Sequence, residues 1–115
     1  MQPLHDRTGQ VYAWLDIKTE HILDLDGRPI AFIVGDSVYD WSGRHIGWWQ
    51  DGHMRDNGGA VVVFRRDATN LIVGRPGLGG IPGEPGKAGV PGRPGLAGKP
   101  YRPRNVGAWS RNMPF

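Results

Sequence analysis

Glycine occupies every third position from residue 74 to residue 100, and no other feature of the sequence restricts the fold so strongly. Six of these nine Gly-X-Y triplets end in proline. A strict glycine period with this much proline is typical of collagen, because only glycine fits at the crowded axis where three polyproline-II chains meet. The tract therefore predicts polyproline-II geometry and favours a homotrimeric triple helix. The nine periodic glycines are Gly74, Gly77, Gly80, Gly83, Gly86, Gly89, Gly92, Gly95 and Gly98.

The length of the tract sets what can lie beside it. A polyproline-II chain rises about 3.1 Å per residue, so residues 74–100 would form a rod of roughly 80 Å. A small head domain is much narrower than that, so we do not expect the tract to lie extended on its own head. We expect neighbouring chains along it, either three parallel copies or a polyproline bundle with other subunits.

Residues 4–65 contain four copies of one pattern: an apolar residue, an aspartate two positions later and a glycine three positions after that. An Asp-x-x-Gly sequence predicts a turn, because the carboxylate accepts hydrogen bonds from nearby backbone N–H groups and glycine adopts positive φ. Each copy is therefore expected to be a hairpin with a bulge. The turn residues are Asp6 and Gly9, Asp24 and Gly27, Asp40 and Gly43, and Asp56 and Gly59.

Apolar residues flank each turn at strand spacing. The positions six and eight after each aspartate, such as Tyr12 and Trp14, are expected on one face of the outgoing strand, at period two. Eight strands at this spacing predict an all-β head of four tandem hairpins with pseudo-fourfold symmetry. We divide the chain into a head (1–73), a collagen-like polyproline-II rod (74–100) and a short C-terminal segment (101–115).

The four copies, particularly residues 24–32 and 39–49, resemble the bacterial four-fold beta-flower family. The end of the chain is similar as well, because family members close with a Trp-Ser pair and a final Phe after a proline-rich basic tail. Trp109, Ser110 and Phe115 occupy those places. The resemblance implies a four-hairpin β fold and no established activity, and the regular Gly-X-Y tract departs from it.

Charge and composition limit the partners. Residues 1–73 carry seven basic and ten acidic side chains, a net charge of −3, and residues 74–115 carry seven and one, a net charge of +6. An acidic head and a basic tail attract each other, within one molecule or between neighbours. Neither a signal peptide nor a membrane span is predicted. We therefore expect a cytoplasmic protein, or one released by a non-Sec route or as part of a virion or appendage.

The residue patterns do not predict an enzyme. The chain has no cysteine, and His5, His21, His45 and His53 show none of the spacings of known metal or catalytic motifs. Asp24-x-Asp26-Gly27 begins like a calcium loop but lacks the later ligands. We expect no catalytic residue, metal or cofactor. The basic charges of residues 74–115 are scattered with little aromatic interleaving, so we do not expect a nucleic-acid partner.

Aromatic and basic residues outside the predicted core are the candidate binding residues. Trp41 lies within a turn and Trp49 on the strand face opposite Trp48, so each is a candidate for contact with a glycan or with another subunit. The basic, aromatic C-terminal segment predicts a docking peptide that binds the acidic head of another copy. Its candidate residues are Tyr101, Arg102, Arg104, Trp109 and Phe115.

Two functions remain open from the sequence. The first is a non-enzymatic structural subunit that self-assembles into a triple-helical trimer, or into a head-to-tail fibre or filament. The second is a binding module whose head recognises a glycan or protein and whose collagen-like stalk makes it multimeric.

Overall fold

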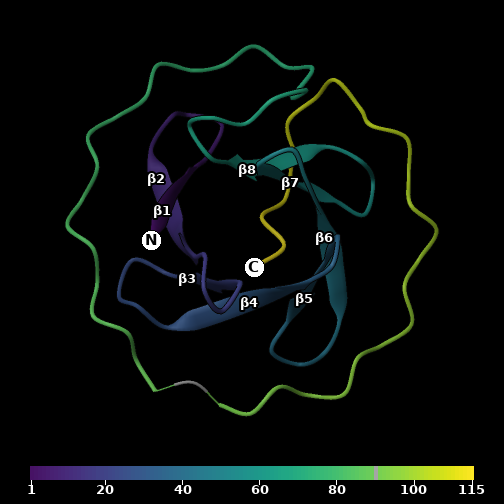
Figure 1. Cartoon of the computed structure of the whole chain (residues 1–115). Helices are drawn as coiled ribbons and strands as arrows, with labels where there is room; N and C mark the ends of the chain where they lie inside the picture. Colours follow the sequence, from purple (N-terminus) through teal and green to yellow (C-terminus); the bar gives the residue numbers. More distant parts are fainter. Residues whose placement is uncertain (90) are drawn as a thin grey trace.

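The computed structural model describes residues 1–89 and 91–115, and Val90 of the predicted tract lies outside the described residues. Eight antiparallel strands form a closed barrel in which each strand pairs with the next along the chain (Figure 1). The described residues contain no helix, so the predicted all-β class is confirmed. The strands are β1 (Gln2–His5), β2 (Val11–Asp16), β3 (His21–Leu23), β4 (Pro29–Val34), β5 (Ser37–Asp40), β6 (His45–Gln50), β7 (His53–Asp56) and β8 (Val61–Phe64).

The four predicted hairpins are β1–β2, β3–β4, β5–β6 and β7–β8, each with an Asp-x-x-Gly turn at its tip. In the second turn, one Asp24 carboxylate oxygen accepts hydrogen bonds from the backbone N–H groups of Asp26 and Arg28, both at 2.9 Å. The Gly27 N–H donates to the Asp24 carbonyl at 3.1 Å. The same bonds recur at Asp6, Asp40 and Asp56, so the turns satisfy the aspartates without a ligand.

A β-bulge follows every turn and changes which side chains face the core. Leu4 pairs with Ala13 and His5 pairs with Val11, so Tyr12 is the extra residue of the first outgoing strand. The prediction that the positions six and eight after the aspartate share one face was wrong, because a bulge interrupts the alternation of side chains. Tyr12 packs against the central core, whereas Trp14 lies in a separate outer cluster. The bulge residues of the other hairpins are Ile30, Ile46 and Val62.

The core of the barrel is built from paired large and small residues. Each incoming strand contributes a fully buried apolar residue that pairs with a small residue of the outgoing strand. Gly47 shows why the partner is small, since a Cβ there would lie 2.6 Å from the Met54 methyl and 2.4 Å from the Arg55 carbonyl oxygen. The four pairs are Leu4 with Ala13, Ile22 with Ala31, Val38 with Gly47, and Met54 with Val63.

The Gly-X-Y tract encircles the barrel instead of extending away from it (Figure 1). The whole molecule measures 37 × 36 × 22 Å, which has no room for a straight rod of roughly 80 Å. The tract was expected not to lie extended on its own head, and it does not, because it curves around the barrel. The inference from its length that neighbouring chains must lie along it does not follow, because a curved chain can circle a domain that it cannot cross in a straight line. We call residues 74–107 the belt.

Residues 108–115, here called the tail, leave the belt and turn inward to end near the centre of the barrel (Figure 1). They enter beside β8, where the Val61 N–H donates to the Ala108 carbonyl at 3.0 Å and the Ser110 N–H donates to the Val61 carbonyl at 2.8 Å. This is the seam of the barrel, since β1 and β8 share only the His5–Phe64 pair. The Phe115 ring stacks on the Tyr12 ring, with 5.9 Å between the ring centres, and packs against the core.

Candidate functional site

The belt makes the same hydrogen bond on each of the four hairpins. A belt N–H donates to the carbonyl oxygen of the glycine in the hairpin turn, at 2.9 to 3.1 Å. Successive donors are nine residues apart, so three Gly-X-Y triplets correspond to one hairpin. The four bonds run from Gly79 to Gly9, from Ala88 to Gly27, from Ala97 to Gly43 and from Val106 to Gly59.

Close approach of the belt requires glycine in the turns. All four turn glycines have φ between +84° and +92°, which disfavours any residue with a side chain. A Cβ at Gly27 would also lie only 1.9 Å from the Gly86 carbonyl oxygen of the belt, and a Cβ at Gly43 only 2.0 Å from that of Gly95. The turn glycines therefore allow the hairpin turns to form and also allow the belt backbone to pack directly on the turns.

A nine-residue repeat inside the belt explains why three triplets correspond to one hairpin. This repeat is less obvious in the sequence than the three-residue glycine period. A charged residue followed by proline recurs every nine residues, at 75–76, 84–85, 93–94 and 102–103. These four prolines are half-buried, whereas Pro82, Pro91 and Pro100 are exposed. The repeat in the sequence is the feature that would have predicted a belt over four hairpins.

The charged position of this repeat lies over the outer aromatic layer of the barrel. The Arg93 guanidinium lies 4.9 Å from the centre of the Phe32 ring, and Arg102 lies 5.4 Å from that of Trp48. Arg75 lies 5.9 Å from Phe64. Arginine over an aromatic face is a favourable cation–π arrangement. The fourth residue, Glu84, lies 3.6 Å from the Met1 amine, beside the hairpin that carries Trp14.

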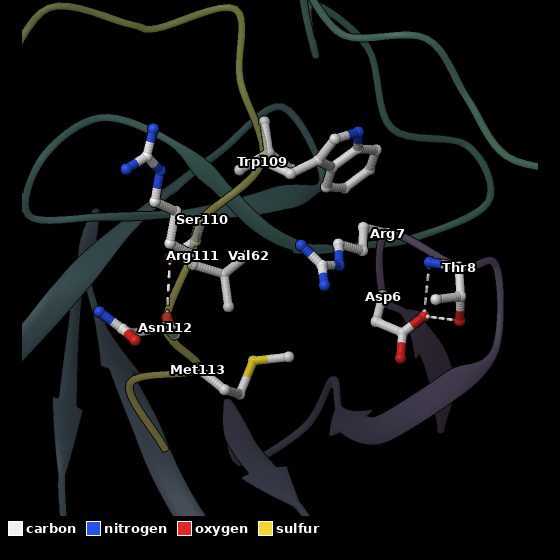
Figure 2. Close-up of a pocket in the computed structure, with 10 residues that line it drawn as sticks. Asp6, Arg7, Thr8, Val62, Trp109, Ser110, Arg111, Asn112 and Met113 are labelled. Atoms are coloured by element: carbon white, nitrogen blue, oxygen red, sulfur yellow. Dashed lines mark hydrogen bonds between the residues drawn. The ribbon is translucent and has the colours of Figure 1, made fainter.

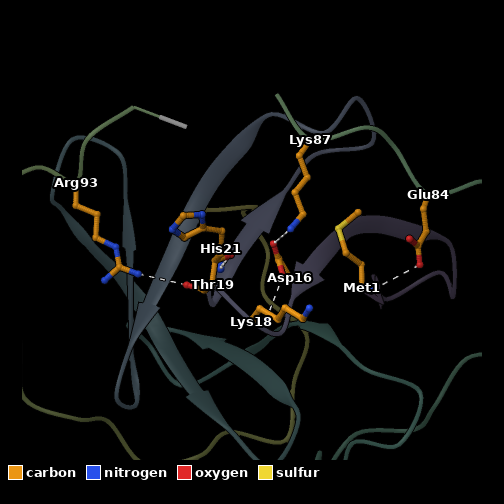
Figure 3. A network of polar contacts seen from close by, with 8 residues as sticks. All are labelled: Met1, Asp16, Lys18, Thr19, His21, Glu84, Lys87 and Arg93. Carbon is orange, nitrogen blue, oxygen red and sulfur yellow. Dashed lines mark hydrogen bonds and ion pairs between the residues drawn. The ribbon is translucent and has the colours of Figure 1, made fainter. Parts of the chain in front are cut away.

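An ion pair holds the belt at the β2–β3 corner (Figure 3). Lys87 Nζ lies 2.5 Å from the carboxylate of Asp16, whose side chain is only 7 % exposed. The hydrogen bond from Lys87 lowers the pKa of Asp16 to about 2, against the opposing effect of burial. Nearby, Arg93 donates to the Thr19 carbonyl at 3.3 Å. The acidic barrel and the basic belt thus attract each other within one molecule.

Arg55 joins the segment just before the belt and the last residues of the belt to the fourth hairpin, and the sequence did not predict this role. Its guanidinium is fully buried and donates to the carbonyl oxygens of Gly59 (2.6 Å), Leu71 (2.7 Å) and Val106 (2.8 Å). Its Nε donates to His53 at 3.1 Å. Burial lowers the pKa of Arg55. The other hairpins carry His5, Leu23 and Tyr39 at this slot, so the departure from the repeat marks the position.

Most of the predicted binding residues contact their own chain. Trp41 is half-buried against Phe32 and His21, and Trp49 packs against the core. Arg102 bridges Asp36, at 2.8 Å, and Gln50. The Trp109 ring lies 5.7 Å from Phe64, and Phe115 reaches the core as described above.

Tyr101 and Arg104 differ from the others. Tyr101 is completely exposed. The Arg104 side chain is exposed while its carbonyl oxygen lies over Gly59. Docking of the C-terminal segment on the acidic head is thus seen within one chain, and docking between chains stays a prediction.

The nine periodic glycines form a surface that the rest of the chain does not use. All nine are exposed, and a Cβ added to any of them would meet no atom within 4 Å in the part of the chain that the structure describes, its two chain neighbours aside. None of the nine is among the glycines with positive φ, so among the described residues neither space nor backbone conformation demands glycine here. We call this row of nine residues the glycine edge. A neighbouring backbone can approach such an edge closely, because no side chain stands in the way.

Other site types find no support in the part of the chain that the structure describes. Residues 1–89 and 91–115 hold no cluster of three histidine, aspartate or glutamate side chains arranged to bind a metal ion. The same residues contain no helix that is long and apolar enough to cross a membrane.

Comparison with known proteins confirms the resemblance. A family model described as "4-fold beta flower protein" matches residues 2–114, which include the belt and most of the tail as well as the barrel. No curated protein and no solved structure gives a significant match.

Proposed function

The chain belongs to the 4-fold beta flower family, and from this premise we propose that it is a non-enzymatic structural subunit that self-assembles through the glycine edge of its belt. The single observation that supports the proposal is that glycine recurs strictly at positions where a side chain would have open space. No contact among residues 1–89 and 91–115 requires glycine at these nine positions. A close approach by the backbone of another copy gives this period a physical reason.

Contact between belts on neighbouring barrels is the form of assembly that the geometry favours. A triple helix made from the same tract must first lift the belt from its barrel. That step breaks the four N–H···O=C bonds to the hairpin turns and the Asp16–Lys87 ion pair, and it exposes the aromatic layer. Belt-to-belt contact keeps all of these interactions and uses only the exposed edge. A head-to-tail fibre requires the tail to leave its own barrel and enter another.

The test measures molar mass by light scattering over a range of protein concentrations. The double variant Gly83→Ala, Gly92→Ala places two methyl groups on the glycine edge, where the chain itself has open space. The control is Gly79→Ala, since Gly79 is outside the glycine period and the equivalent belt positions are Ala88 and Ala97. We expect the wild type and the control to form oligomers, and the double variant to stay monomeric with an unchanged melting temperature.

Two results would contradict the proposal. A wild-type chain that is monomeric at every concentration has no self-assembly to explain. A double variant that assembles as well as the wild type shows that the glycine edge is not the contact. A collagen-like circular dichroism melt that is separate from barrel unfolding would instead support the triple helix.

A binding module is the second candidate, and one observation favours it. A pocket of about 300 Å³ opens at the seam of the barrel, a volume at the lower end of what small-ligand sites require.

A further inference from the structure

The seam pocket lies between the first and fourth hairpins, where the tail turns inward (Figure 2). Its volume is about 300 Å³. One wall is the turn of the first hairpin, another is β8, and the third is the tail. The lining residues used below are Asp6, Arg7, Val62, Trp109 and Met113.

The wall formed by the tail is held in place by several bonds. Ser110 Oγ lies 2.6 Å from Asp56 Oδ2, so the hydroxyl ties the tail to the turn of the fourth hairpin. The backbone of residues 108–110 pairs with Val61, and the Trp109 ring packs on Phe64. A pocket whose walls are fixed in this way needs little reorganisation to hold a ligand.

Arg7 supplies the charge that faces the pocket. In Figure 2 its guanidinium points into the space between Trp109, Val62 and Met113, whereas Arg111 points away. Arg7 makes no ion pair with any residue among 1–89 and 91–115. The neighbouring Asp6 carboxylate is engaged by its own turn, through Thr8 N–H at 2.9 Å and Thr8 Oγ1 at 2.5 Å. The pocket therefore presents an exposed guanidinium that no carboxylate of the described residues pairs with, beside the side chains of Trp109, Val62 and Met113. Polar residues complete the lining: Thr8, Ser110, Arg111 and Asn112.

We propose that this pocket binds a small monocarboxylate with an aromatic body. A guanidinium binds a carboxylate through two parallel hydrogen bonds. The Trp109 ring and the side chains of Val62 and Met113 then cover the aromatic ring. The nearby Asp6 carboxylate repels a dianion such as phosphate, which makes a single negative charge the better match. This site does not involve the glycine edge, so a failure of one proposal leaves the other unaffected.

The experiment titrates the full chain with benzoate at millimolar concentrations, using isothermal calorimetry and the NMR resonances of residues around the seam. Benzyl alcohol has the same ring without the charge, and acetate has the charge without the ring. We expect benzoate to shift the NMR resonances of Arg7 and of the Trp109 indole. Each of the two analogues should bind at least about tenfold more weakly than benzoate. Arg7→Gln should weaken benzoate binding by about the same factor.

Arg28→Gln is the matched control, because Arg28 is exposed near the turn of the second hairpin and does not line the seam pocket. It should bind benzoate as the wild type does. The proposal is overturned if benzoate does not bind, if benzyl alcohol binds as tightly as benzoate, or if both arginine variants weaken binding equally. An unchanged melting temperature for Arg7→Gln separates a lost contact from lost folding.

Discussion

The turn glycines of the barrel and the periodic glycines of the belt are the same residue used under opposite conditions. In the turns, positive φ and a belt carbonyl about 2 Å from the missing Cβ leave no alternative to glycine. On the glycine edge, φ is not positive and a Cβ meets nothing. A glycine pattern alone therefore does not reveal whether the constraint comes from the chain itself or from outside it. The predictions below test this difference, from the largest expected effect to the smallest.

The largest effect is expected where barrel and belt are joined. Arg55→Met removes the donor to the carbonyl oxygens of Leu71 and Val106, while the Gly59 carbonyl keeps the Val106 N–H. Each unmade bond to a buried group costs about 1–3 kcal/mol. We expect the free energy of unfolding to fall by about 3–4 kcal/mol in chemical denaturation. Arg55→Lys should recover only a small part, because an ammonium cannot reach the same set of carbonyls in a plane. Full stability in Arg55→Met would show that the hydrogen bonds of Arg55 are not needed to hold barrel and belt together.

The next largest effect tests the turn side of the comparison. Gly27→Ala forces a side chain into positive φ and against the Gly86 carbonyl, so we expect a loss of about 2 kcal/mol or more. Limited proteolysis should cut the belt faster in this variant. Gly86→Ala is the matched control on the belt and should change stability by less than about 1 kcal/mol. Equal losses in the two variants would remove the distinction between the two kinds of glycine.

A smaller effect is expected at the belt's ion pair. Lys87→Met leaves the buried Asp16 carboxylate without its cation, and we expect a loss of about 1 kcal/mol at neutral pH, because Lys87 is half-exposed. The pKa of Asp16 is lowered to about 2 in the folded chain, so the contribution is full above its unfolded pKa near 4 and fades as the pH falls toward 2. The difference between wild type and variant should shrink over that window. A constant difference across it would assign the loss to something else.

Mild acid should have the smallest effect. Burial lowers the pKa values of His21, His45 and His53, so these side chains bind protons less readily when folded than when unfolded. Their contribution is present above about pH 6.5 and decreases as the pH falls below that value. Melting temperatures measured from pH 7.5 to pH 5 should fall gradually. A rise over this range would mean that the folded chain favours the charged imidazoles.

The sequence predicted what depends on neighbouring residues and missed what depends on distant ones. The Asp-x-x-Gly turns were predictable, because the bonds of Asp24 reach only to Arg28. The bulge at Tyr12 was predicted in kind, but its effect on side-chain direction was not. Strand alternation alone placed Tyr12 and Trp14 on one face, while pairing across the hairpin separates them.

The course of the belt was missed for a different reason. A three-residue glycine period dominates the tract and indicates collagen, whereas the contacts follow the weaker nine-residue repeat that begins at Arg75. The basic C-terminal segment was expected to bind the acidic head of another copy, whereas Arg102 contacts Asp36 of its own head. Opposite net charges do not specify which copy of the head a segment contacts. The charges alone therefore did not show that the acidic partner lies in the same chain.

Amide hydrogen exchange along the belt tests the central claim most directly, because the belt is held by one N–H bond per hairpin. The account predicts slow exchange at Gly79, Ala88, Ala97 and Val106, a period of nine, with fast exchange at the exposed amides between them. Protection that repeats every three residues would indicate a triple helix. Uniformly fast exchange would indicate a free tract. Either of these two results would contradict a belt that encircles its own barrel.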